Sequence, residues 1–243
     1  MIHVIQFSGG AASALVAKMV ADEHGKENVV LLHHDTKAED PDTYRFLKQV
    51  SKHIGVPVVD VSDGRSLWEV IEDNKALPSD RMPFCTRILK QEPGEYYFRW
   101  LELQGIEYTM YNGFGPDEWS RVQRAVIRAE TAGRKLKCPL FEQNIGGEEV
   151  KRIIREEWKI CLPNAYKTMK HNNCIPCFKA GKASWRKVWE FYPEQFAKAV
   201  ELEKRFGHTV FKGESLEELA RLWEANQMPS LWEDDGIPCM CAI

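Results

Sequence analysis

The sequence predicts an α/β protein built on a parallel sheet, because short β-prone segments alternate with helical segments in its first part. Residues 2–7 and 29–35 are mostly apolar before their polar ends, and both are typical of buried strands. Residues 14–23 combine good helix formers with apolar side chains at helical spacing. A strand, a helix and a strand joined by short loops form a parallel βαβ unit.

The same alternation continues along the chain. Asp40 suits the N-cap of a second helix, and residues 57–61 predict a third strand. In parallel sheets, ligands bind beyond the carboxyl ends of the strands, so residues 8–13, 33–36 and 60–63 are expected around one crevice. A further strand is predicted over 107–113, a loop over 77–86, and helices over 66–74, 95–104, 122–132, 148–159, 182–206 (broken at Pro193) and from the capping box 215–218.

The length of 243 residues suits one sizeable α/β domain with an appendage, or two small domains. We predict a nucleotide-binding α/β domain over residues 1–140 and a helical portion with most of the cysteines over 141–243. The net charge of −3 argues against a global basic field that would attract nucleic acid. No apolar run reaches the ~18 residues of a membrane span, and the start lacks a signal-peptide pattern, so a cytoplasmic protein is expected.

The turn from the first strand to the first helix reads SGGAAS, from Ser8 to Ser13. Glycines at such a turn let the backbone approach an anion, and a helix N-terminus directs N–H groups and roughly half a positive charge toward it. The two serine hydroxyls add further donors. The segment therefore predicts a phosphate or sulfate site, with an ordinary glycine turn as the alternative.

The order Ser-Gly-Gly-x-x-Ser after a first strand resembles the PP-loop of the adenine nucleotide α-hydrolase superfamily. Ala12 stands where many ATP-cleaving members carry Asp, which favours the branch similar to phosphoadenosine phosphosulfate (PAPS) reductase. The resemblance covers roughly residues 3–206. It implies a Rossmann-like, HUP-type parallel sheet with helices on both faces, followed by a helical, cysteine-bearing C-terminal portion. It also implies that the nucleotide phosphate is bound by Ser8, Gly9, Gly10 and Ser13.

Three more segments resemble this family. Asp35 and Thr36, which precede the segment EDPDTY at residues 39–44, occupy the family's Asn-Thr position near the adenosine, with a turn as the alternative interpretation. The segment RMPFCTRILK resembles the family stretch near the nucleotide phosphates or a cluster. Its cations can bind phosphate, although a solvated basic turn is the alternative. The segment GFGPDEWSR lacks the family's Ile-Arg pair but retains its last arginine. The resemblance thus adds as nucleotide-binding candidates Asp35, Thr36, Arg81, Arg87, Lys90 and Arg121.

The seven cysteines include one Cys-x-x-Cys pair, Cys174 and Cys177, whose spacing can bind one metal ion or one cluster edge. In a reducing compartment, clustered cysteines are more often ligands or redox groups than disulfides. The resemblance adds Cys85 as a third ligand. For the fourth we choose Cys161 over Cys138, because it is nearer in sequence, with His171 as an outside candidate. A 4Fe-4S cluster is the first expectation; structural zinc, a redox dithiol or plain buried cysteines are the alternatives.

The chain ends in a Cys-x-Cys, Cys239 and Cys241. In PAPS reductases a C-terminal cysteine attacks the sulfate sulfur, and thioredoxin resolves the S-sulfo intermediate. The placement here is similar, but the family's E-C-G-x-H context is missing. Either cysteine is therefore a candidate catalytic nucleophile, and the pair can instead supply a cluster ligand or be a frayed end.

The resemblance implies a PAPS reductase-like oxidoreductase that binds a small adenine nucleotide and reduces PAPS or APS (adenylyl sulfate) to sulfite and PAP or AMP. Thioredoxin or glutaredoxin would be the reductant. The first alternative is an adenylating sulfurtransferase with an iron–sulfur cluster, and only this function implies a nucleic-acid partner. The second alternative is a non-catalytic nucleotide-binding protein with structural zinc. No membrane partner is expected, and a homodimer is left open.

Overall fold

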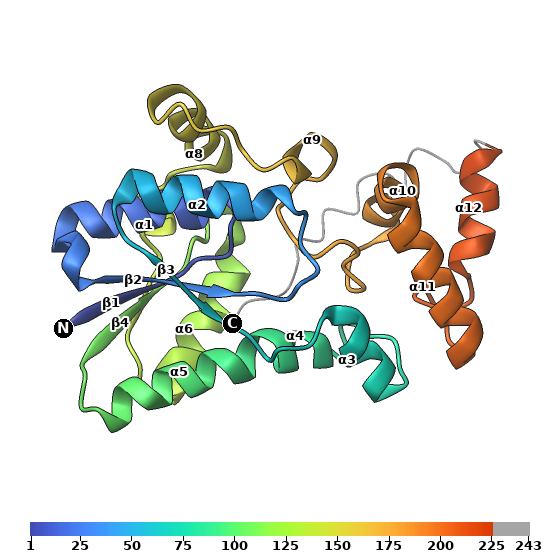
Figure 1. Ribbon diagram of the computed structural model, residues 1–243, viewed down its shortest axis with the longest axis horizontal. Coiled ribbons are helices and arrows are strands. Elements are labelled where there is room, and N and C mark those ends of the chain that lie inside the picture. Colours follow the sequence, from blue (N-terminus) through green and yellow to red (C-terminus); the bar gives the residue numbers. More distant parts are fainter. Residues whose placement is uncertain (226–243) are drawn as a thin grey trace.

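The structure, a computed structural model, describes residues 1–225 and contains a parallel sheet (Figure 1). Its strands follow the order β3-β2-β1-β4-β5, and every neighbouring pair is parallel. From the central strand β1 the chain proceeds outward on one side through β2 and β3, and then returns to the other side of β1 for β4 and β5. This reversal creates a switch point at the carboxyl end of β1. The strands are β1 (Ile2–Gln6), β2 (Val29–His34), β3 (Val58–Val61), β4 (Tyr108–Tyr111) and β5 (Leu136–Lys137).

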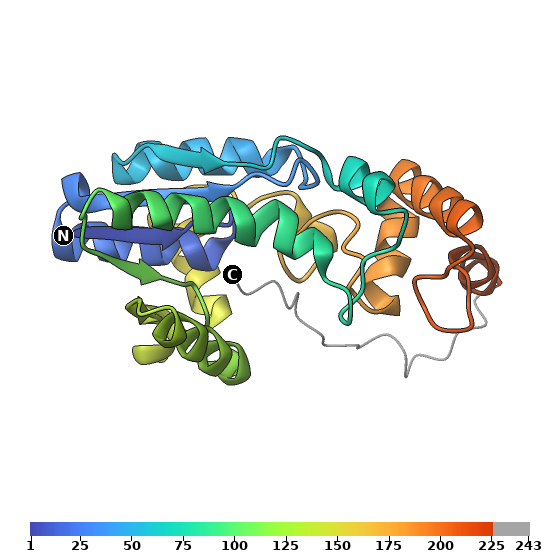
Figure 2. The ribbon, with the colours of Figure 1, turned by 90° about the horizontal axis from the view of Figure 1, so that it is seen from below.

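Helices cover both faces of the sheet, which confirms the predicted Rossmann-like class (Figures 1 and 2). One face packs against α1 (Ala11–His24), α2 (Asp42–Ile54) and α8 (Gly147–Arg152). The other face packs against α5 (Glu92–Leu103), and α6 (Trp119–Thr131) lies beside β5 at the sheet edge. Val4 and Ile5 show how the strand serves both cores, because neighbouring side chains of a strand point to opposite faces.

The helix before β4 begins earlier than predicted. Phe84–Thr86 forms a short α4, Arg87–Gln91 is a π-turn (η2), and α5 follows without a break. Pro93 lacks an N–H and would crowd the preceding helical turn, and the wider π-turn lies directly before it. Arg87 and Lys90 therefore lie on helical backbone instead of in the predicted basic loop or turn.

A second core lies among the C-terminal helices, around the fully buried Trp185. Its helices are α3 (Leu67–Asn74), α10 (Lys182–Phe191), α11 (Pro193–Phe206) and α12 (Leu216–Glu224), and the predicted break at Pro193 and capping box at Ser215 are both present. Packing crosses the predicted domain boundary at residue 140 in both directions, since α8 packs on α1 while α3 joins the C-terminal core. The remaining short elements are η1 (Lys26–Asn28), η3 (Pro116–Glu118), α7 (Pro139–Glu142), η4 (Ile153–Glu157) and α9 (Ala165–Thr168).

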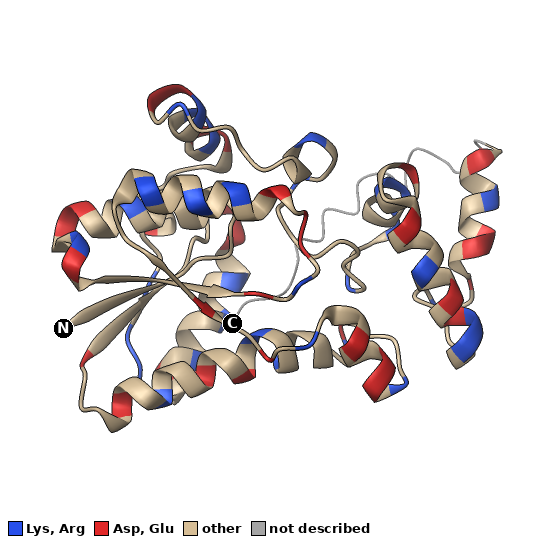
Figure 3. Cartoon of the chain, in the orientation of Figure 1, with Lys and Arg blue, Asp and Glu red and all other residues tan. Residues whose placement is uncertain are grey.

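Residues of both charge signs are distributed along the helices, with Lys and Arg interspersed among Asp and Glu (Figure 3). This distribution agrees with the small net charge of −3. Within residues 1–225, no helix combines the length and the apolar character that crossing a membrane requires.

Candidate functional site

The PP-loop connects β1 to α1 at the switch point of the sheet. Gly9 has a φ of +73°, and a Cβ at this position would lie 2.5 Å from Cγ2 of Thr43. Both the backbone angle and the crowding therefore require glycine. The Ser13 hydroxyl donates to the Gly10 carbonyl at 3.0 Å, and the Ser8 and Ser13 hydroxyl oxygens lie 3.3 Å apart. Both hydroxyls are thus held at the opening of α1.

The first turn of α1 is suited to an anion, because the first N–H groups of any helix have no partner within it. Gly10 is the N-cap residue, and no side chain caps the helix there. The first helical amide, that of Ala11, donates to the Tyr166 hydroxyl at 3.0 Å. Gly113, after β4, packs so closely on this turn that an added Cβ would lie 2.8 Å from the Ser13 nitrogen. The end of β4 therefore forms one wall of the PP-loop.

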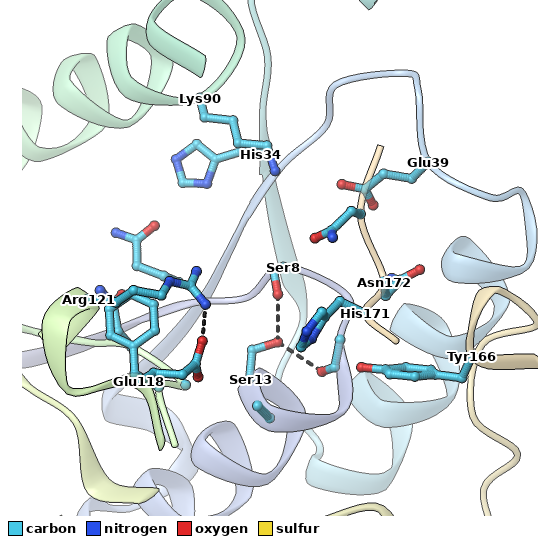
Figure 4. A pocket seen from close by; sticks show the side chains of 17 residues that line it. Ser8, Ser13, His34, Glu39, Lys90, Glu118, Arg121, Tyr166, His171 and Asn172 are labelled. Atoms are coloured by element: carbon cyan, nitrogen blue, oxygen red, sulfur yellow. Dashed lines mark hydrogen bonds and ion pairs between the residues drawn. The ribbon is translucent and has the colours of Figure 1, made fainter. Parts of the chain in front are cut away.

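A cavity of about 170 Å³ opens above the PP-loop (Figure 4). Its lining comes from the PP-loop, the carboxyl ends of β1 and β2, the residues after β4, the start of α6 and the segment 171–173. It shares Ala12, Gly113, Arg121 and Tyr166 with a second cavity of about 830 Å³ that continues toward α8. The site is therefore one hollow with a narrow polar part at the PP-loop and a wider extension.

Cationic and polar side chains approach the PP-loop from several elements. Lys90 reaches the cavity from η2, and Arg121 reaches it from α6. Arg121 pairs with Glu118, and its guanidinium lies 4.5 Å from the centre of the Phe114 ring. Burial, together with the nearby charge of Lys90, lowers the pKa of His34 to about 3, so this imidazole is neutral at pH 7.

Several buried polar atoms of the cavity have no hydrogen-bond partner among residues 1–225. They are both amide atoms of Gln6, Nε2 of His34, Oε2 of Glu39 and Nε of Arg121. Buried polar groups in folded proteins are nearly always paired with protein or water, so such a group calls for an explanation. A cavity that combines a helix N-terminus, two cations and several unmet hydrogen-bonding atoms is suited to hold a polar, anionic ligand.

The cavity brings together five of the predicted nucleotide-binding residues: Ser8, Gly10, Ser13, Lys90 and Arg121. Gly9 supports the loop from behind, where its carbonyl accepts a hydrogen bond from the Asn172 amide at 3.0 Å. Asp35 and Thr36 are not among the residues that line it. The Asp35 carboxylate accepts hydrogen bonds from the Tyr44 hydroxyl at 2.7 Å and from the Lys37 amide at 2.9 Å, as a turn residue does.

Two predicted phosphate ligands lie outside this cavity. Arg81 is exposed in the loop before α4 and does not line it. Arg87 pairs with Glu92 at 2.5 Å and lines a different cavity, of about 480 Å³, between α5 and α6. Arg87 and Lys90 lie on one helical segment, and of the two only Lys90 lines the PP-loop cavity.

The structure assembles only part of the predicted cysteine set. Cys85, at the start of α4, and Cys174 both pack against the C-terminal core and are half-buried, as is Cys177. Cys174 Sγ lies 3.3 Å from the Thr36 hydroxyl, which connects the Cys-x-x-Cys segment to the loop after β2. Asn173, directly before Cys174, lines the cavity above the PP-loop, so the cysteine segment begins at the edge of that cavity.

Cys161 lies elsewhere, exposed in the loop after η4, where its carbonyl accepts a hydrogen bond from Arg45 of α2 at 3.1 Å. Within the described residues, no three His, Cys, Asp or Glu side chains are grouped so that they could hold a metal ion. The four-cysteine set is therefore not formed there, and the choice of Cys161 for its closeness in sequence finds no support. The candidate nucleophiles Cys239 and Cys241 lie outside the described residues.

Sequence reasoning missed much of the cavity wall. Gln6 ends a buried strand, and its polarity in that place was a usable signal, whereas His34 belongs to the segment 33–36 that was expected at the crevice. Tyr166 and Asn172 gave no such signal, because they reach the PP-loop from a segment far along the chain. His171, the outside metal candidate, also lines the cavity, and burial lowers its pKa.

The sheet order, with a glycine-containing loop at its switch point, defines a Rossmann-like α/β protein. Residues 2–106 match the family model described as the phosphoadenosine phosphosulfate reductase domain. This similarity covers less than half of the chain and agrees with the PP-loop resemblance of the sequence. The match includes the PP-loop and the first three strands.

Two individual proteins are also similar to the chain. The uncharacterized protein MJ0973 of Methanocaldococcus jannaschii is 27% identical over 234 residues, which cover 92% of this chain and 51% of that protein. The chain thus spans about half the length of the curated relative that it matches. A crystal structure of phosphoadenylyl-sulfate reductase from Candida auris, in a phosphate complex, aligns with a TM-score of 0.47 and 17% identity, covering 68% of this chain and 76% of that chain.

Proposed function

We propose that the chain binds an adenine nucleotide with a phosphate on the PP-loop. The observation that carries this proposal is the convergence of the α1 N-terminus, Ser8, Ser13, Lys90 and Arg121 on one cavity at the switch point of the sheet. Backbone amides and cations at a helix N-terminus are a general means of binding phosphate. The second cavity, of about 830 Å³, enlarges the hollow on the Arg121 side and leaves room for ligand groups beyond the phosphate and ribose.

On this site we propose the reduction of a sulfonucleotide, PAPS or APS. A cysteine thiolate, from Cys239 or Cys241, attacks the sulfur atom and forms an S–S bond, while the S–O bond to the nucleotide phosphate breaks and AMP or PAP leaves. A thiol of a dithiol protein, of the thioredoxin or glutaredoxin class, then attacks the enzyme sulfur and releases sulfite. Its second thiol resolves the mixed disulfide, so the dithiol is oxidised and the sulfate sulfur is reduced. Cations near the phosphate stabilise the leaving group.

One observation favours a second candidate, an adenylating sulfurtransferase. Cys174 directly follows Asn173, which lines the cavity, so its thiol would lie near an activated nucleotide bound there. In that reaction, ATP would activate an acceptor such as a nucleic acid and release pyrophosphate. The iron–sulfur cluster expected for this class remains a prediction, and analysis of iron, acid-labile sulfide and zinc in anaerobically purified protein tests it.

The deciding assay supplies PAPS, APS or ATP to the anaerobic protein with a dithiol reductant. Release of sulfite supports reduction, whereas pyrophosphate release that depends on an acceptor supports transfer. Bound zinc without turnover supports a binding protein. The double variant Ser8→Ala/Ser13→Ala should weaken AMP binding at least about tenfold, or 1.4 kcal/mol. Ser184→Ala, on α10 outside the cavity, is the matched control. Unchanged AMP affinity in a folded double variant would contradict the phosphate site.

A further inference from the structure

A buried carboxylate lines the cavity, and one of its two oxygens has no hydrogen-bond partner among residues 1–225. Glu39 lies between β2 and α2, its side chain is only 2% exposed, and it lines the cavity (Figure 4). Its Oε2 has no hydrogen-bond partner among the residues that the structure describes. Nε2 of His33 lies 3.7 Å from this oxygen, beyond hydrogen-bond length, so Oε2 can still accept a hydrogen bond from a ligand group in the cavity.

Glu39 is held from behind by a histidine. His33 is fully buried at the end of β2, with Nδ1 2.7 Å from Oδ1 of Asp60 and Nε2 3.7 Å from Oε2 of Glu39. Burial lowers the pKa of His33, but the two neighbouring carboxylates outweigh this effect, and the net shift is upward. A proton on His33 is thus favoured between two carboxylates, and its charge holds the Glu39 side chain in place.

The charge of Glu39 limits what this wall of the cavity can accept. Glu39 and Arg121 lie on opposite sides of Ser8 in Figure 4, so the cation is available to a phosphate on one side while the carboxylate repels an anion on the other. In an adenine nucleotide, the neutral donors are the ribose hydroxyls and the 6-amino group. Glu39 and the PP-loop both line the narrow part of the cavity, which has a volume of about 170 Å³. Ribose is the neutral group attached directly to the phosphate. With the phosphate on the PP-loop, the ribose is therefore the group that lies within reach of Glu39.

We propose, on the basis of the proposed nucleotide site, that Glu39 accepts hydrogen bonds from the ribose hydroxyls of the bound nucleotide and excludes nucleotides with a phosphate on the ribose. An acidic side chain reads ribose hydroxyls in the same way in dinucleotide-binding folds, where a cation is needed instead when that ribose is phosphorylated. His33 acts as a positioning residue for Glu39. The substrate class is then a nucleotide with a free ribose, such as APS or ATP, and not PAPS.

The test measures the dissociation constants of AMP and of adenosine 3′,5′-bisphosphate by calorimetry on the full chain. The wild type should bind AMP at least about tenfold more tightly than the bisphosphate. In Glu39→Gln, which keeps the shape and removes the charge, this ratio should fall toward one, mainly because the bisphosphate binds better. Glu92→Gln, on α5 outside this cavity, is the matched control and should keep the wild-type ratio.

Two further measurements separate the roles. The wild-type protein should bind 3′-deoxy-AMP several-fold more weakly than AMP, because the deoxy ligand lacks one hydroxyl that Glu39 accepts from. This comparison of two ligands requires no variant. His33→Gln should lower the AMP-to-bisphosphate ratio part of the way, a readout that a general loss of folded protein does not move. The proposal is overturned if the wild type prefers the bisphosphate or if Glu39→Gln leaves the ratio unchanged. If AMP does not bind, or still binds fully to Ser8→Ala/Ser13→Ala, the nucleotide site itself fails and this inference fails with it.

Discussion

His34 should make the stability of the protein fall in mild acid. Its pKa drops from 6.5 to about 3 on folding, chiefly because the imidazole is buried and secondly because Lys90 and His33 lie nearby. The unfolded chain therefore binds the proton more readily than the folded one, so the free energy of unfolding decreases as pH falls below 6.5. The loss levels off near pH 3, where the folded imidazole also becomes protonated.

The magnitude follows from the two pKa values. Each pH unit between them is worth about 1.36 kcal/mol, so His34 alone should cost about 2.5 kcal/mol of stability between pH 7 and pH 4.5. Urea unfolding at both pH values, for the wild type and for His34→Gln, isolates this contribution. The variant has no titratable group at position 34. Any change in stability that the substitution causes through packing is the same at both pH values, so it cancels when the two free energies of unfolding are subtracted. A stability difference between the two proteins that stays constant from pH 7 to pH 4.5 would refute the reasoning.

Three other changes have definite expected results. Gly113→Ala places a Cβ 2.8 Å from the backbone of the first turn of α1, so it should cost about 1–3 kcal/mol and weaken AMP binding; equal thermal stability and affinity would show that β4 does not press on the PP-loop. Glu203→Gln removes one of two buried acceptors that bind backbone amides, each at 2.7 Å, and should cost about 1–3 kcal/mol in chemical unfolding, with no effect on AMP affinity. Tyr166→Phe removes the 3.0 Å acceptor of the Ala11 amide and should lower stability by about 1 kcal/mol, which a urea titration resolves.

The sequence predicted the elements whose signals are local. Apolar runs marked the first three strands, the glycine pair marked the PP-loop, and the Ser215 capping box marked the last described helix. The strand β5 was missed because Leu136–Lys137 is too short for any periodic pattern. The helical run from Phe84 was not predicted, and it accommodates Pro93 by a π-turn directly before that proline.

Long-range geometry was much less predictable. Nearness in sequence made Cys161 the choice for a fourth ligand, but Arg45 holds that loop against α2, away from the cysteines that pack on the C-terminal core. Glu39 carried no pattern at all, because its burial depends on the fold placing His33 behind it. Predicting such a residue requires knowing which side chains face one another across the cavity.

Asn172 joins two parts of the molecule that differ in chemistry. Its amide nitrogen donates to the Gly9 carbonyl, and its amide oxygen accepts from the Thr43 hydroxyl at 3.0 Å. Cys174 follows two residues later. The Asn172 side chain therefore connects the segment that carries this thiol to the glycine turn of the PP-loop. Oxidation or alkylation of Cys174 that displaces its segment would therefore also shift the glycine turn. Conversely, a ligand bound at the glycine turn would restrict the movement of the Cys174 sulfur.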